Sequence, residues 1–134
     1  MTKIIYSNPD GSVSIVIPTG SIDDAKKAVP SGVSYEIVED NKIPTDRTFR
    51  NAWVKGSGVV TEDITKAKAI AHATRREKRE AEFKPHDDII AKQIPGESAS
   101  DAETARAAIR TKYATMQTNI DKATTTAKIK EALG

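Results

Sequence analysis

The sequence predicts an α+β fold, with a small N-terminal β-hairpin/β-β-α-β unit followed by an antiparallel helical hairpin. Three observations support this class. In the N-terminal part, segments rich in β-branched residues alternate with turn residues. No glycine occurs between Gly58 and Gly96, and residues 62–134 contain fifteen alanines. Strands favour β-branched residues, whereas helices favour alanine and exclude glycine. We therefore expect a β-rich unit over residues 1–58 and a charged helical region over residues 59–134.

The N-terminal unit begins with two predicted strands, over residues 3–7 and 12–18. Asn8-Pro9-Asp10-Gly11 joins them, and a tight turn is expected there because proline presets φ and glycine accepts positive φ. Ser21 is the expected N-cap of a short helix that the next proline ends. A third strand is expected over residues 34–39, where apolar and polar residues alternate.

Residues 41–58 are expected to form a junction that packs on this sheet. Phe49 and Trp53 stand four residues apart, so one helical turn capped by Asp46 would place both rings on one face. Lys55-Gly56-Ser57-Gly58 lacks the Gly-Lys-Ser/Thr ending of a phosphate-binding loop, so we expect a flexible joint there. We expect both rings to anchor the junction against the β unit, and we include them in a predicted partner interface.

A long helix is expected to begin beyond this junction, with Thr61 or Asp63 as its N-cap. It should continue at least to the residue before Pro85, because a residue that precedes proline is biased out of the helical region. We expect a kink or break at that point. Residues 89–94 then resume the helix, and Pro95-Gly96 ends it.

A second long helix is expected to start at the capping box Ser100-Asp101-Ala102-Glu103. Its apolar residues recur at steps of three and four, which is the spacing of one helix face. They are Ala102, Ala105, Ile109, Tyr113, Met116 and Ile120. A helix that returns from the Pro95-Gly96 turn should lie antiparallel to the first. A short, weak helix over residues 124–133 closes the chain.

Ile109, Tyr113 and Met116 complete the predicted partner interface. The first long helix offers few large side chains to this stripe, and alanines contribute little at about 0.8 kcal/mol per buried methylene. Its apolar residues are Ile64, Ala67, Ile70, Ala71 and Ala81. Two explanations stay open: another chain, which could be a second copy in a homo-oligomer, completes the hairpin, or the hairpin is marginal and mobile.

Charge is spread evenly along the chain. Residues 1–61 carry seven basic and seven acidic side chains, and residues 62–134 carry fourteen and twelve. Because phosphate binding concentrates positive charge on one segment, we expect no nucleic-acid partner. The basic run Arg75, Arg76, Lys78 and Arg79 alternates with glutamates, so we expect a solvated helix face laced with salt bridges. The N-terminus turns polar by Ser7, so we expect neither a signal peptide nor a membrane partner.

The sequence offers little that could carry catalysis. His72 and His86 are too far apart to share one helix face, and Asp87-Asp88 alone supplies too few further ligands for a metal site. Cysteine is absent, and no nucleophile motif or catalytic carboxylate pair stands out. We therefore expect no enzyme, no metal and no cofactor. An enzyme would require a pocket that gathers one of the histidines with carboxylates.

The residues Ile43-Pro44-Thr45-Asp46-Arg47-Thr48-Phe49-Arg50-Asn51-Ala52-Trp53, followed by Asp63-Ile64-Thr65-Lys66-Ala67-Lys68-Ala69-Ile70, resemble small proteins of tailed bacteriophages and prophages. The resemblance covers residues 33–80, and the chain departs from it after Lys84. It implies a non-catalytic virion-associated or tail-assembly protein, made in the host cytoplasm, whose partners are other virion or tail components. The alternative is a phage-encoded regulator or inhibitor that binds a host protein.

Overall fold

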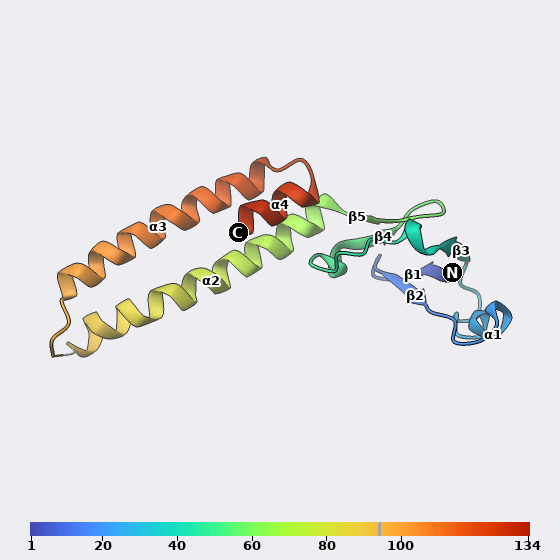
Figure 1. Cartoon of the computed structure of the whole chain (residues 1–134), viewed down its shortest axis with the longest axis horizontal. Helices are drawn as coiled ribbons and strands as arrows, with labels where there is room; N and C mark the ends of the chain where they lie inside the picture. The colour runs from blue at the N-terminus through green and yellow to red at the C-terminus, as the bar shows by residue number, and fades with distance from the viewer. Residues whose placement is uncertain (94) are drawn as a thin grey trace. The chain divides into compact units, whose positions relative to one another are not determined.

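The computed structural model describes residues 1–93 and 95–134, which form two units, Met1–Ala67 and Lys68–Gly134. Strands lie in the first unit and long helices in the second, so the predicted α+β class with a helical hairpin is confirmed (Figure 1). The first unit extends beyond the expected boundary at residue 58, because one more strand precedes the first long helix. None of the described helices is long and apolar enough to cross a membrane.

The N-terminal sheet has the predicted β-β-α-β order. Its strands are β1 (Thr2–Ser7), β2 (Val13–Val16) and β3 (Tyr35–Glu39), and all pairings are antiparallel in the order β2-β1-β3. Gly11 adopts φ +86° in the turn between β1 and β2, a conformation that disfavours side chains. Helix α1 (Ile22–Lys26) follows, and the Ser21 hydroxyl accepts a 3.1 Å hydrogen bond from the Asp24 N–H, as the capping rule predicts.

A second β-hairpin follows where we expected a helical junction. Two 3-10 turns, η1 (Asp40–Lys42) and η2 (Arg50–Ala52), lead into β4 (Trp53–Lys55), which pairs antiparallel with β5 (Val60–Glu62). The predicted helical turn through Phe49 and Trp53 is therefore wrong. Asp46 does act as a local cap, but its carboxylate accepts from the Thr48 N–H at 2.9 Å in a turn and not at a helix start.

The expected flexible joint at Lys55–Gly58 is the tight turn of this hairpin. The Gly56 N–H donates to the Val59 carbonyl at 2.7 Å, and Gly58 adopts φ +67°. Of the two glycines that suggested flexibility, Gly58 is favoured because the turn needs positive φ there. Hydrophobic strand residues on both sides make this an ordered hairpin.

The core of the first unit lies between the three-stranded sheet and the β4–β5 hairpin. It contains Ile5, Val13, Val38, Trp53 and Val60, with Ile15 and Ile43 packed at its edge. The predicted anchoring of Trp53 against the β unit is confirmed, because its side chain is only 1% exposed among these residues. Ile4 points to the opposite face by strand alternation, and it is also fully buried. Helix α1 contacts β1.

Helix α2 (Ile64–Lys92) is continuous, so of the kink or break predicted at Pro85 the break is wrong, and the kink stays a prediction. Its N-cap is Asp63, one of the two expected residues, whose carboxylate accepts from the Lys66 N–H at 2.9 Å. Proline removes one backbone hydrogen bond inside a helix, but helical turns and tertiary packing on both sides compensate for that loss. The predicted helical segment 89–94 is helical through Lys92, and its last residue, Ile94, lies outside the described residues.

Helix α3 (Ala99–Lys122) begins slightly earlier than predicted. Ser98 is its N-cap, and the Ser98 hydroxyl accepts from the Asp101 N–H at 3.1 Å, so the proposed capping box at Ser100 is wrong. The predicted apolar stripe is confirmed: Ala102, Ile109, Tyr113 and Ile120 are its buried members. Helix α4 (Thr126–Leu133) follows, capped by the Thr125 hydroxyl, and buries Ile129 and Leu133.

Polar contacts between α2 and α3 show that they are antiparallel, as Figure 1 also shows. His72 Nε2 lies 2.8 Å from an Asp121 carboxylate oxygen, and the Glu82 and Lys112 side chains approach to 2.7 Å. Early residues of α2 thus face late residues of α3. Helix α4 packs on α3, and Lys78 Nζ donates to the Leu133 carbonyl at 3.2 Å, which ties α4 to α2.

Candidate functional site

Two arginine side chains converge on the single tryptophan of the chain. The Arg50 guanidinium carbon lies 4.7 Å from the centre of the Trp53 ring, and the Arg47 guanidinium carbon lies 5.6 Å from it. Both distances are within the range of a cation–π interaction. Strand β4 positions the ring, η2 carries Arg50, and Arg47 lies in the preceding turn, where its carbonyl accepts from the Arg50 N–H at 3.1 Å.

The two arginines differ in how firmly they are held. Arg50 is half-buried and donates from a terminal nitrogen to the Val13 carbonyl at 3.0 Å. Burial, and then the neighbouring charge of Arg47, lowers the pKa of the Arg50 guanidinium, which nonetheless stays protonated in any aqueous protein. Arg47 is exposed, and among the described residues its guanidinium forms no ion pair. Arg47 therefore keeps its hydrogen-bond donors available.

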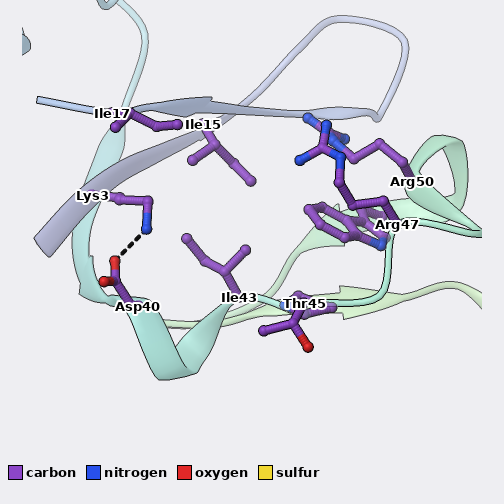
Figure 2. A pocket seen from close by; sticks show the side chains of 10 residues that line it. Lys3, Ile15, Ile17, Asp40, Ile43, Thr45, Arg47 and Arg50 are labelled. Atoms are coloured by element: carbon purple, nitrogen blue, oxygen red, sulfur yellow. Dashed lines mark hydrogen bonds and ion pairs between the residues drawn. The ribbon is translucent and has the colours of Figure 1, made fainter. Parts of the chain in front are cut away.

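A hollow of about 450 Å³ opens beside these arginines, and we call it the Trp53 hollow. Its wall is formed by Ile15, Ile17, Ile43, Pro44 and Thr45, together with Lys3, Asp40, Arg47, Arg50 and Trp53. Figure 2 shows Lys3 and Asp40 joined by an ion pair at one side and the two arginines at the other, with Ile15 and Ile43 between them. The hollow thus combines an apolar wall with a cationic end.

The charges around the Trp53 hollow do not balance. Three cationic side chains, Lys3, Arg47 and Arg50, line it against one carboxylate, Asp40. That carboxylate already pairs with Lys3 and lies 3.9 Å from the N-terminal amine, and the Lys3 hydrogen bond, more than its charge, lowers the pKa of Asp40. The positive potential at the arginine end is therefore uncompensated within the hollow, which suits an anionic group.

The hollow was not predicted from the sequence, although Trp53 was. Arg47 and Arg50 were noted only as part of the bacteriophage-like segment. Their spacing around an aromatic residue was a usable signal, because arginine often stacks on tryptophan. The contribution of Lys3 and Asp40 had no such signal, since they are 37 residues apart and meet only through the pairing of β1 with β3.

Phe49, the other aromatic residue of the predicted interface, is 3% exposed and does not line the Trp53 hollow. Ile109, Tyr113 and Met116 lie in the second unit. There Ile109 and Tyr113 form a buried cluster with Phe83, and Met116 packs against it. These residues therefore cover one another within the chain, and their role toward a partner remains a prediction.

Phe83 of α2 is a buried residue that we did not predict from the sequence. It lies on the same four-residue spacing as Ala67, Ala71 and Arg75, which would have placed it on the buried face. Two guanidinium groups cover its ring, Arg79 at 4.6 Å and Arg106 at 5.6 Å. The hairpin thus has a larger apolar contact than the predicted alanine seam.

The basic run in α2 is only partly the solvated face that we expected: Arg76 and Lys78 are exposed, but Arg75 and Arg79 are not. Arg75 is only 8% exposed and donates from Nε to His72 Nδ1 at 3.3 Å. Arg79 stacks on Phe83, and Lys78 reaches the Leu133 carbonyl. Long basic side chains bury their hydrocarbon parts along apolar surface, which explains why the run contributes to packing.

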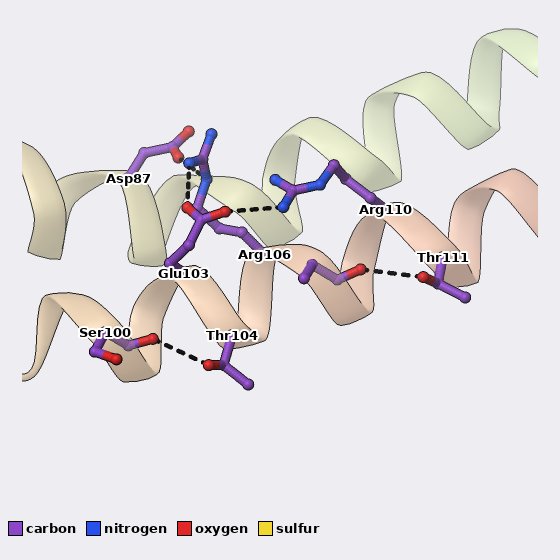
Figure 3. A network of polar contacts seen from close by, with 8 residues as sticks. Asp87, Ser100, Glu103, Thr104, Arg106, Arg110 and Thr111 are labelled. Carbon is purple, nitrogen blue, oxygen red and sulfur yellow. Dashed lines mark hydrogen bonds and ion pairs between the residues drawn. The ribbon is translucent and has the colours of Figure 1, made fainter.

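A network of charges lines the other end of the hairpin (Figure 3). Glu103 accepts from Arg106 and from Arg110, each at 2.8 Å, and Arg106 Nε lies 2.9 Å from an Asp87 oxygen. The hydrogen bond from Arg110, followed by that from Arg106, lowers the pKa of the Glu103 carboxyl. The pair of Arg106 with Asp87 joins α3 to α2, whereas the two contacts of Glu103 lie within α3.

The structure does not bring the two histidines together with metal-binding partners. His72 contacts Asp121 and Arg75, whereas His86 lies further along α2. Across residues 1–93 and 95–134, no group of three or more His, Asp or Glu side chains could hold a metal ion. The Trp53 hollow is therefore the candidate site.

One more surface feature was outside the sequence expectations. Strand β3 is an outer strand of its sheet and exposes two large apolar side chains, Tyr35 at 40% and Ile37 at 45%. They point to the same face, since they are two residues apart in a strand.

A comparison of the chain with protein-family models, with curated proteins and with solved structures found no match.

Proposed function

We propose that this chain is a non-catalytic bacteriophage protein that acts by binding other proteins, as a virion-associated or tail-assembly component. The observation that carries the proposal is the outer strand β3, which presents Tyr35 and Ile37 to solvent on one face. Outer strands are normally protected against pairing with other chains by charge, proline or a cover. An outer strand with exposed apolar side chains suits the addition of a partner strand.

The bacteriophage assignment rests on the resemblance carried by residues 43–53 and 63–70. The first of these segments contains Arg47, Arg50 and Trp53, so the part of the sequence that resembles phage proteins also builds the candidate site. The proposal thus joins one recognisable segment with two surfaces of the same unit, the β3 edge and the Trp53 hollow.

The decisive experiment is mass spectrometry of purified phage particles produced from the genome that encodes this chain. We expect peptides of the chain in particles, at a constant ratio to a major tail or capsid protein after repeated gradient purification. If the chain is absent from particles and instead copurifies with a host protein, the regulator or inhibitor alternative replaces this proposal.

A variant pair tests the β3 edge. Ile37→Lys places a charge on the exposed face of β3 and should abolish particle incorporation, since edge lysines prevent strand addition. Ser31→Lys, in the exposed turn before β3, is the matched control and should be incorporated normally. Equal incorporation of both variants would show that β3 is not the docking edge.

A further inference from the structure

The Arg47 side chain is exposed, and its guanidinium carbon lies 5.6 Å from the centre of the Trp53 ring, toward the outer end of the cation–π range. Arg50 already covers the same ring at 4.7 Å and is anchored by the Val13 carbonyl. Two like charges near one ring repel each other, and an anion placed between them would relieve that repulsion.

Asp40 is the only carboxylate among the described residues that line the hollow, and it pairs with Lys3 on the side away from the arginines. Guanidinium groups bind carboxylates with paired, charge-assisted hydrogen bonds. An external carboxylate is therefore the group that best complements the arginine end.

The rest of the hollow is shaped for more than a simple anion. Ile15 and Ile43 form an apolar wall between its two charged sides, and Ile17 continues it at the rim with 61% of its surface exposed. A volume of about 450 Å³ falls within the usual range of ligand sites. Exposed isoleucine beside such a hollow favours a ligand that carries an aliphatic group next to its charge.

We infer that the Trp53 hollow binds an acidic, aliphatic segment of a partner protein. A carboxylate of that segment lies between Arg47 and Arg50, and its neighbouring aliphatic side chain covers Ile15, Ile17 and Ile43. This inference rests on the proposed function, because it takes the ligand to be a protein. It adds a second contact to the β3 edge and names the chemistry that the partner must present.

Nucleic acid fits the hollow less well than a peptide. Single strands are bound by exposed aromatic faces and a continuous track of cations. Here the ring of Trp53 is 1% exposed and covered by the guanidinium groups, and residues 1–61 carry as many acidic as basic side chains. An apolar wall also has no role in contacting phosphates.

The test uses the full chain and three short peptides, each acetylated and amidated so that terminal charges are absent. The first repeats Asp-Leu, the second replaces its aspartates by asparagine, and the third replaces its leucines by serine. Because Trp53 is the only tryptophan, its fluorescence reports binding at the hollow directly. We expect saturable binding of the Asp-Leu peptide and roughly tenfold or weaker affinity for each of the other two.

Variants test separately whether the arginine end and the apolar wall of the Trp53 hollow contribute to peptide binding. Arg47→Gln and Ile17→Ser should each weaken Asp-Leu binding by roughly tenfold, and Arg47→Lys should weaken it less. Both positions are exposed, so the variants should keep the unfolding midpoint of the parent protein. Arg76→Gln removes the same charge from an exposed position of α2 and should leave the affinity unchanged.

Three results would overturn the inference. They are no fluorescence response to the Asp-Leu peptide, equal affinity for the serine peptide, and tighter binding of a single-stranded oligonucleotide that also depends on Arg47. The Ile37→Lys variant separates this test from the proposed function: it should lose particle incorporation while it still binds the peptide. If the chain is incorporated into particles but does not bind the peptide, the proposed function is retained and the inference that the hollow binds a partner protein is refuted.

Discussion

The Glu36 carboxylate accepts a 2.8 Å hydrogen bond from the backbone N–H of Gly58. This contact joins the outer strand β3 to the turn between β4 and β5, and Lys55 Nζ supports it at 3.2 Å from the same carboxylate oxygen. The exposed strand that we propose as a docking edge is therefore fastened to the hairpin that carries Trp53. The strength of this contact between β3 and the hairpin depends on the negative charge of Glu36.

The first prediction concerns the stability of the first unit at low pH. The hydrogen bond from Gly58, followed by that from Lys55, lowers the pKa of Glu36 in the folded protein. The contribution of Glu36 to stability is therefore present above the ordinary glutamate pKa and disappears as pH falls through the lower, folded value. A carbon-detected NMR titration should show Glu36 titrating below the usual range.

Lys55→Met provides the control for this titration. It removes the lysine that helps to lower the pKa of Glu36 but leaves the Gly58 N–H in place. The pKa of Glu36 should therefore rise only part of the way toward its ordinary value. A Glu36 carboxyl that titrates in the usual range in the parent protein would contradict the observed contact.

Trp53 should tolerate phenylalanine far better than alanine. Trp53→Ala removes a side chain that is 1% exposed and should lower the free energy of unfolding by about 3 kcal/mol or more. Trp53 Nε1 is buried and has no hydrogen-bond partner among the described residues, so Trp53→Phe loses no hydrogen bond, leaves a smaller cavity and should cost less than Trp53→Ala. Urea unfolding followed by circular dichroism measures both, and similar losses for the two variants would show that Nε1 is hydrogen-bonded in solution.

A glycine pair tests whether the β4–β5 turn is ordered. Gly58→Ala forces a side chain into φ +67° and should destabilise the first unit by about 1 kcal/mol. Gly20→Ala is the matched control, since that glycine lacks positive φ and has open space around it. Thermal unfolding of the two variants should differ accordingly, whereas equal midpoints would favour the flexible joint that we first expected.

Replacing Pro85 should strengthen the helical unit. Proline at this exposed position of α2 donates no hydrogen bond to the carbonyl four residues earlier. Pro85→Ala should therefore raise the free energy of unfolding by about 1 to 3 kcal/mol, while Glu80→Ala, at an exposed position of the same helix, should change it by less than about 0.5 kcal/mol. Amide exchange along α2 checks this, and a loss of protection in Pro85→Ala would show that the proline supports a needed distortion.

The last prediction compares packing with charge in the helical hairpin. Exchanging both Ile109 and Met116 for serine should cost about 3 kcal/mol or more, because both pack against the Phe83–Tyr113 contact. Arg76→Gln should cost less than about 0.5 kcal/mol. Arg75 and Arg79 are unsuitable as surface controls, since Arg75 is buried and Arg79 covers Phe83.

Amide exchange across residues 68–122 and capture of virion proteins should be measured on the same variants. If the serine variant keeps its protection while Arg76→Gln loses partner binding, the charged face is the recognition surface. In that case the apolar stripe belongs neither to the stability of the hairpin nor to its interface.

Local rules alone predicted much of this fold. The caps at Ser21 and Asp63, the three strands of the first sheet and the stripe on α3 follow from spacing and side-chain chemistry within a few residues. The errors arose where local preference competed with packing. Pro85 lies inside a helix because the turns on both sides are stabilised by tertiary contacts, and Trp53 begins a strand because its burial outweighs the helical spacing to Phe49.

By itself, the sequence determined the class of fold, the even charge and the importance of Trp53 and the α3 stripe. Only the tertiary structure decided that Lys3, Asp40, Arg47 and Arg50 meet around one hollow, and that Tyr35 and Ile37 stay exposed on an outer strand. The physical reason is that periodicity reports which face of an element is apolar. Which distant residues share a surface depends on strand order and register, which no local pattern in this chain encodes.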